Sequence, residues 1–203
     1  MKIADTVCGR WLLAALAAMT LFSASPRAQT PELENTVKPG DSEIHRMRVA
    51  DQDDRRGFMG KSKAEWDEVA RRDAERRKRT MEIYHSGGLV TGGDYFDAAL
   101  ILQHGDKPDD YLLAHVLCVV AIDKGVGADA RWLSAATLDR YLQSIQHKQI
   151  FGTQYDGDDK KGYTSEPYDP ALLIDAIRKA LDVPVLEQQK KDLEKFNKSL
   201  SSR

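Results

Sequence analysis

Apolar residues recur at helical spacing along most of the chain, which predicts a protein that is mainly α-helical. Helices are expected over residues 42–58, 62–85, 94–104, 108–124, 128–144 and 170–181, and from residue 184 onward. A capping box of Ser62 and Glu65 begins the second helix, and Gly87 follows its last turn. Short connections between the third, fourth and fifth helices predict an antiparallel helical bundle.

The helix expected over residues 108–124 is apolar nearly all round, which predicts a place at the buried centre of the bundle. Its Cys118 is expected to be a small buried hydrophobe and not a catalytic thiol. The second helix carries a looser apolar stripe that is interrupted by charge. Its residues predicted to face the core are Trp66, Ala70, Ala74, Met81 and Tyr84.

Residues 148–157, with the sequence KQIFGTQYDG, break the helical pattern with an extended run. Ile150 and Phe151 favour β structure, and the polar stretch DGDDKKG that follows predicts a turn. Residues 163–170 are expected to return as the second arm of a short β-hairpin near the C-terminal third. Gly152 has no side chain, so another backbone or a ligand could approach it closely.

Residues 1–28 have the order typical of a secretory signal peptide. Lys2 and Arg10 precede an apolar run from Trp11 to Phe22, and small residues follow. This run is shorter than the ~20 residues that a membrane-spanning helix needs. A retained membrane anchor is the alternative interpretation.

Cleavage is expected after Ala28, followed by a flexible linker over residues 29–41 and a single helical domain over residues 42–203. The mature protein is then expected to be periplasmic or extracellular, without membrane attachment. Its one remaining cysteine, Cys118, cannot form an intramolecular disulfide.

The formal net charge of -2 over 203 residues does not favour nucleic acid as the main partner. Residues 70–79 are rich in arginine, but Asp73 and Glu75 dilute the run, which predicts a solvated helix face. The stretch GGLVTGGD lacks the Gly-Lys-Ser/Thr ending of a phosphate-binding loop. DGDDKKG has lysines where a calcium loop needs an acid and a glycine. Neither a metal ion nor a cofactor is therefore expected.

Several polar residues fall where the pattern predicts buried positions. They are Gln103, His104, His115 and Asp139 on the helices and Gln149, Thr153 and Gln154 in the extended run. A buried polar group without a partner costs about 1–3 kcal/mol, so these groups are expected to bond to one another between the bundle and the extended run. Such a network serves either as a structural lock or as a ligand site.

The same residues carry a resemblance to a known family. The segments LILQHGDKPDDYLLAHVL, RWLSAATLDRYL and KQIFGTQYDG contain, in order, a Gln-His pair, an Asp-Arg pair and a Gln-x-Phe-Gly-Thr-Gln element. Residues 94–184 therefore resemble an uncharacterised bacterial family, a domain of unknown function, which brings no known activity. The site residues implied by this resemblance are Gln103, His104, Asp139, Arg140, Gln149, Gly152, Thr153 and Gln154.

Three functions are consistent with these residues. The first is a non-enzymatic helical module that binds a protein or peptide of the cell envelope. The second is a hydrolase with His104 as general base, Asp139 as its orienting carboxylate, Arg140 or Gln154 stabilising negative charge, and Thr153 as nucleophile. The third is a protein that binds a small ligand in the same polar pocket without turnover.

Overall fold

The computed structural model of the chain describes residues 42–57, 60–158 and 160–201. The predicted signal peptide and the predicted linker over residues 29–41 lie outside the described residues. Among the described residues, no helix combines the length and the apolar character that crossing a membrane requires.

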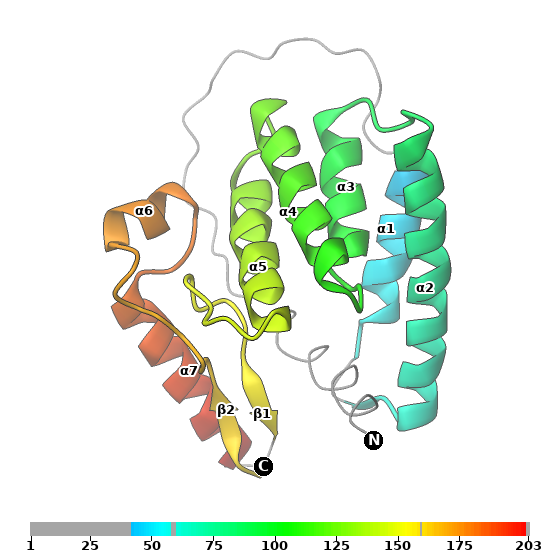
Figure 1. Cartoon of the computed structure of the whole chain (residues 1–203). Helices are drawn as coiled ribbons and strands as arrows, with labels where there is room; N and C mark the ends of the chain where they lie inside the picture. Colours follow the sequence, from blue (N-terminus) through cyan, green and yellow to red (C-terminus); the bar gives the residue numbers. More distant parts are fainter. Residues whose placement is uncertain (1–41, 58–59, 159, 202–203) are drawn as a thin grey trace.

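Seven helices and one two-stranded sheet make up the described part of the chain. The elements are α1 (Glu43–Asp54), α2 (Lys63–His85), α3 (Gly92–Leu102), α4 (Pro108–Asp123), α5 (Ala128–Ser144), β1 (Asp156–Asp158), β2 (Gly162–Thr164), α6 (Asp175–Ala180) and α7 (Leu186–Ser201). Helices α1 to α5 lie side by side, and the hairpin, α6 and α7 lie beyond α5 (Figure 1). The predicted fold class, a mainly α antiparallel bundle with a short β-hairpin in the C-terminal part, is confirmed.

Local capping residues set where the helices begin. Ser62 and Glu65 form the predicted capping box of α2. Helix α3 begins earlier than predicted, because Thr91 is its N-cap and Asp94 is the third residue of a second capping box. In that box the Asp94 carboxylate accepts a hydrogen bond from the backbone N–H of Thr91 at 2.8 Å. The helix predicted over residues 170–181 forms only as the short α6.

Two apolar clusters hold the elements together. The larger cluster lies between α1, α3, α4 and α5, and it includes Leu102, Leu117 and Leu133. The smaller cluster joins Ala135 of α5 to Phe151 and Val183 in the C-terminal part. Trp132 packs against both clusters, so the bundle and the C-terminal part share one side chain of α5.

Helix α4 is buried on one side only. Its inward residues include Ala114, Leu117, Cys118 and Ala121, whereas Leu112, Val116 and Val119 are exposed. The prediction that α4 is buried all round is therefore wrong, because α3 and α5 cover only its inner side. Cys118 is fully buried as predicted, and burial raises the pKa of its thiol to about 12.

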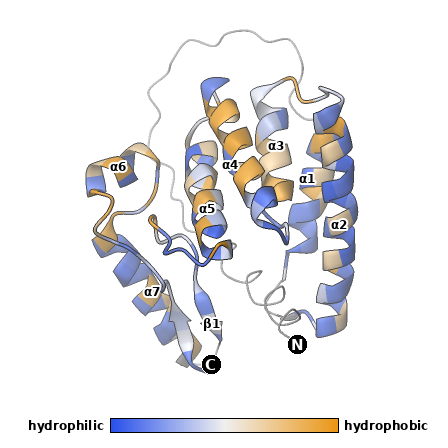
Figure 2. Cartoon of the chain, viewed as in Figure 1, coloured by the Kyte–Doolittle hydropathy of each residue, from blue (hydrophilic) through white to orange (hydrophobic). Residues whose placement is uncertain are grey.

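Helix α2 turns a polar face toward the bundle. Its buried residues are Val69, Asp73, Arg76 and Thr80. The predicted apolar stripe is wrong at Ala70, Ala74 and Tyr84, which are exposed, while Trp66 and Met81 are partly buried. Figure 2 shows that α2 is largely hydrophilic, whereas α3 and α4 are more apolar. The hydrophobic periodicity of the sequence does not identify the inward face of α2, because charged side chains attach α2 to α1.

The hairpin forms later in the chain than predicted. Strand β1 pairs antiparallel with β2, with Gly157 opposite Tyr163. Residues 150–155, expected to be the first arm, have no strand structure, and Gln149 makes only an isolated bridge to Tyr168. The hydrogen bonds that hold these residues explain the difference.

Candidate functional site

The buried carboxylate of Asp139, on α5, organises the loop of residues 149–154. Its Oδ1 accepts hydrogen bonds from the backbone N–H groups of Ile150 at 2.8 Å and Phe151 at 3.0 Å. Its Oδ2 accepts from the Thr153 N–H at 3.0 Å and from the Thr153 hydroxyl at 2.8 Å. Four donors surround the carboxylate, which matches the acceptor capacity of its two oxygens. The loop is therefore wrapped around this side chain and cannot run on as a flat strand.

The electrostatic setting of Asp139 combines opposing effects. Burial raises the pKa of the Asp139 carboxyl group above its usual value, and the backbone N–H bonds from Phe151, Thr153 and Ile150 oppose this rise without cancelling it. Hydrogen bonds from donors favour the charged form of a carboxylate. The ionised group is thus stabilised by the loop that it holds.

Two glutamines close the same loop by side-chain to backbone bonds. The Gln149 amide donates to the backbone oxygen of Gln154 at 2.8 Å and to that of Ser165, and its own oxygen accepts from the Gln154 N–H at 3.0 Å. The Gln154 amide donates to the Ala136 carbonyl of α5 at 3.2 Å and to the Thr153 hydroxyl at 3.0 Å. Both side chains are buried, so the loop satisfies its own polar groups.

Gly152 stands at the tightest point of the loop. Its φ of +72° lies in the left-handed region that favours glycine. A Cβ atom at this position would lie 2.8 Å from Cζ of Tyr168 and 3.0 Å from Oε1 of Gln189. The close approach predicted for Gly152 is therefore made by two side chains of the protein itself.

Two residues that the sequence analysis missed complete the loop from the C-terminal side. Arg178 of α6 is fully buried and donates to the carbonyls of Phe151 at 2.8 Å and Ile150 at 3.2 Å. Gln189 of α7 donates to the Phe151 carbonyl at 2.7 Å. Arg178 lies on a short helix whose other residues are all exposed, so no apolar pattern marks it. Gln189 lies between Leu186 and Leu193 at helical spacing, so the apolar stripe of α7 is the signal that could have identified it.

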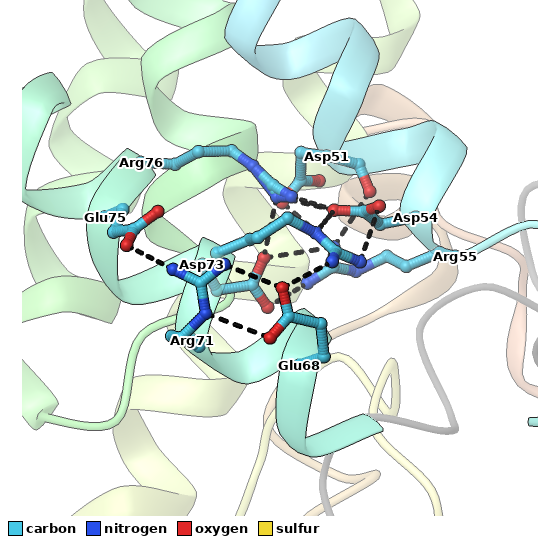
Figure 3. A network of polar contacts seen from close by, with 9 residues as sticks. Asp51, Asp54, Arg55, Glu68, Arg71, Asp73, Glu75 and Arg76 are labelled. Atoms are coloured by element: carbon cyan, nitrogen blue, oxygen red, sulfur yellow. Dashed lines mark hydrogen bonds and ion pairs between the residues drawn. The ribbon is translucent and has the colours of Figure 1, made fainter. Parts of the chain in front are cut away.

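A second polar group lies where α1 meets α2, and Figure 3 shows its ion pairs. The buried Arg55 donates to Asp51 at 3.0 Å and to Asp73 at 2.7 Å. Arg76 binds Asp54 and also lies 3.3 Å from Asp73. The arginine-rich run of α2 is thus partly buried and paired with α1 carboxylates, which corrects the prediction of a fully solvated face.

His104 lies next to this cluster and is buried. Its Nε2 is 3.5 Å from Oδ2 of Asp51, and neither ring nitrogen makes a hydrogen bond within the described part of the chain. Burial holds the pKa of His104 well below its usual value, and four nearby arginines add to the effect, Arg55 and Arg140 the most. The imidazole is therefore neutral at pH 7.

Of the Asp-Arg pair, only Arg140 reaches the Gln-His pair at the C-terminal end of α3. Arg140 of α5 donates through Nη1 to the Gln103 carbonyl at 3.1 Å. Arg77 of α2 donates to the His104 carbonyl at 2.9 Å. Two cations thus bind the free carbonyls at a helix C-terminus, where positive charge is favourable.

The eight predicted site residues fall into two groups. The Asp139 side chain binds the loop that contains Gln149, Gly152, Thr153 and Gln154, whereas the Arg140 side chain reaches the end of α3 at Gln103 and His104. Asp139 and Arg140 are neighbours in sequence but serve different groups. Within residues 42–57, 60–158 and 160–201, no three His, Cys, Asp or Glu side chains are placed to hold a metal ion.

Comparisons with protein-family models, with curated proteins and with solved structures find no match to this chain.

Replacement of Asp139 by asparagine is expected to destabilise the protein by about 2–5 kcal/mol, because the amide nitrogen would face buried N–H donors and leave them without an acceptor. Urea unfolding at pH 7 measures the change. Asp123→Asn, at an exposed position near the end of α4, is the control and should change stability by less than about 0.5 kcal/mol. Equal stability of the two variants would show that the loop does not depend on the carboxylate.

The contribution of Asp51 to the free energy of unfolding is expected to fall as pH rises from about 4 to about 7. Burial raises the pKa of Asp51 from 3.8 to about 7, with Arg55 opposing the shift and Asp73 adding to it. The folded state then holds a proton that the unfolded state has released, so this contribution is complete below pH 4 and lost by about pH 7. The full change is on the order of 4 kcal/mol.

The free energy of unfolding of wild type and of Asp51→Asn is measured by urea unfolding from pH 4 to 8. The difference between the two proteins at each pH is the contribution of Asp51, because the other carboxylates are present in both. Asp53→Asn, on the exposed side of α1, should keep the wild-type slope. A wild-type slope in Asp51→Asn would contradict the assignment.

Proposed function

We propose that the protein is an exported, non-catalytic module that binds a protein or peptide of the cell envelope. In this proposal the buried polar residues lock the fold, and an exposed apolar face provides the binding surface. The observation that carries the proposal is the exposed apolar side of α4, since the polar groups of the loop are already satisfied within the protein.

The hydrolase alternative has weaker geometric support. The Thr153 hydroxyl donates to Asp139 and accepts from the Gln154 amide, and Thr153 is buried. No hydrogen bond joins His104 to Thr153 or to Asp139 among the described residues. A nucleophile needs contact with its activating base, so catalysis would require these groups to rearrange.

The outer face of α4 is apolar between Asp109 and Asp123. Leu112, Val116 and Val119 are 37%, 48% and 50% exposed. They stand at positions i, i+4 and i+7 and therefore share one side of the helix. Contiguous exposed apolar surface is typical of interaction sites, and the strongly apolar colouring of α4 is visible in Figure 2.

Charge at the two ends of this face indicates the chemistry of the partner. Asp109 and Asp123 are exposed near the beginning and end of α4. A matching partner is an amphipathic helix with apolar residues at i, i+4 and i+7 and basic residues at both ends. Helices of this kind bind apolar grooves and faces through such anchors.

Export is supported by the order of charged, apolar and small residues over positions 1–28. We expect the mature protein to begin at Gln29 when it is isolated from the periplasm or the medium of the producing cells. Mass spectrometry of the intact protein and sequencing of its N-terminus measure this. Recovery of only the uncut chain from the cytoplasm would contradict export.

A photo-crosslinking residue at position 116 should capture one specific envelope protein in the producing cells. This position is chosen because Val116 is at the centre of the apolar face, where the partner is expected to make contact. Val90 is 63% exposed and lies outside α4, so the same label at position 90 is the control. The substitution Leu112→Asp should abolish capture from position 116 without lowering the melting temperature.

Three results would overturn the α4 proposal. They are capture that survives Leu112→Asp, capture that is equal from positions 116 and 90, and crosslinks only to a second copy of the chain. The last result would assign the face to self-association.

A further inference from the structure

The guanidinium of Arg140 has one buried edge without an acceptor. The residue is 6% exposed, and its Nη1 donates to the Gln103 carbonyl. Its Nε and Nη2 are buried and have no hydrogen-bond partner within the described chain. These two groups lie on the same edge of the planar fork, which is the edge that binds a carboxylate with two parallel bonds.

Other arginines of this protein use the same edge in this way. Arg72 donates from Nε and Nη2 to the two carboxylate oxygens of Asp54, each at 2.9 Å. Arg79 donates from Nε and Nη2 to the two oxygens of Glu43 at 2.6 and 2.8 Å. The Nε–Nη2 edge of Arg140 is thus chemically equivalent to sites that are filled by carboxylates elsewhere in the fold.

The charge around Arg140 is not balanced by the protein. Arg55 and Arg76 are each paired with carboxylates of α1 and α2. Arg140 forms no ion pair with any acidic side chain of residues 42–57, 60–158 and 160–201. Burial lowers the pKa of Arg140 to about 10, so the side chain is still a cation at pH 7. A buried charge without a counter-charge is strongly unfavourable.

The groups next to Arg140 suit a small polar ligand. Gln103 is 2% exposed and its Oε1 has no hydrogen-bond partner within the described residues. The neutral imidazole of the adjacent His104 offers one donor and one acceptor, both unused. Because Arg140, Gln103 and His104 are all buried, we expect the ligand to be small.

We propose that a small carboxylic acid binds as its anion to the Nε–Nη2 edge of Arg140, with Gln103 and His104 beside it. The carboxylate supplies the missing negative charge and accepts two parallel hydrogen bonds. This binding is independent of the α4 face and would add a second, small-molecule ligand to the proposed interaction module.

Calorimetric titration of the mature protein at pH 7 tests the proposal with three sodium salts at matched ionic strength. These are acetate, glycolate and chloride. Acetate or glycolate should bind, and chloride should not compete at equal concentration. Arg140→Lys should weaken binding at least about tenfold, because a lysine cannot form the two parallel bonds. Arg131→Lys on the same helix is the matched control and should bind as wild type does.

A second variant separates ligand binding from a structural role. Arg140→Met should lose binding and stay folded without ligand, because removal of the unbalanced buried charge offsets the loss of the hydrogen bond to the Gln103 carbonyl. Leu112→Asp should leave binding of the acid unchanged, so failure of the α4 proposal does not affect this result. Absence of binding by both acids, equal binding of chloride, or wild-type affinity in Arg140→Lys would overturn the proposal.

Discussion

The hydrogen bonds accepted by one buried carboxylate connect the two parts of this fold. Asp139 holds the loop of residues 149–154 against α5, and the carbonyls of that loop accept from Arg178 and Gln189 of α6 and α7. The apolar cluster at this junction is small, with Ala135, Phe151 and Val183 as its buried members among the described residues. Directional bonds in a low-dielectric setting therefore carry much of the attachment.

The other side of the bundle is attached by charge. Helix α2 contacts α1 through Asp73 and Arg76, and buried ion pairs of this kind add little net stability because both partners lose their hydration. They are selective, however, since any shift of α2 along α1 would leave a buried charge unpaired. The hydrogen bonds around Asp139 and the ion pairs between α1 and α2 lie at opposite sides of the bundle. Both favour one arrangement of the helices, because any other arrangement would leave buried polar groups without partners.

Much of the fold could be predicted because helix signals are local. The capping box at Ser62 and the bounds of α2, α4 and α5 follow from residues within a few positions of each helix end. The strand predicted at Ile150 failed because the four bonds to Asp139 outweigh the β preference of a few residues. The inward face of α2 could not be read from hydrophobic periodicity, since Asp73 and Arg76 occupy it. The candidate site was anticipated in part: most of the loop residues were identified, but Arg178 lies on a helix whose pattern gives no inward face.

The polar attachment of α2 also bears on the heat capacity of unfolding. Exposure of apolar surface raises the heat capacity, whereas exposure of polar surface lowers it. Four residues of α2 are buried, and release of the helix exposes them. Three of them, Asp73, Arg76 and Thr80, are polar, and only Val69 is apolar. This helix therefore contributes less to the heat-capacity increment than its length suggests, and the curvature of the stability–temperature profile arises mainly from α3, α4 and α5.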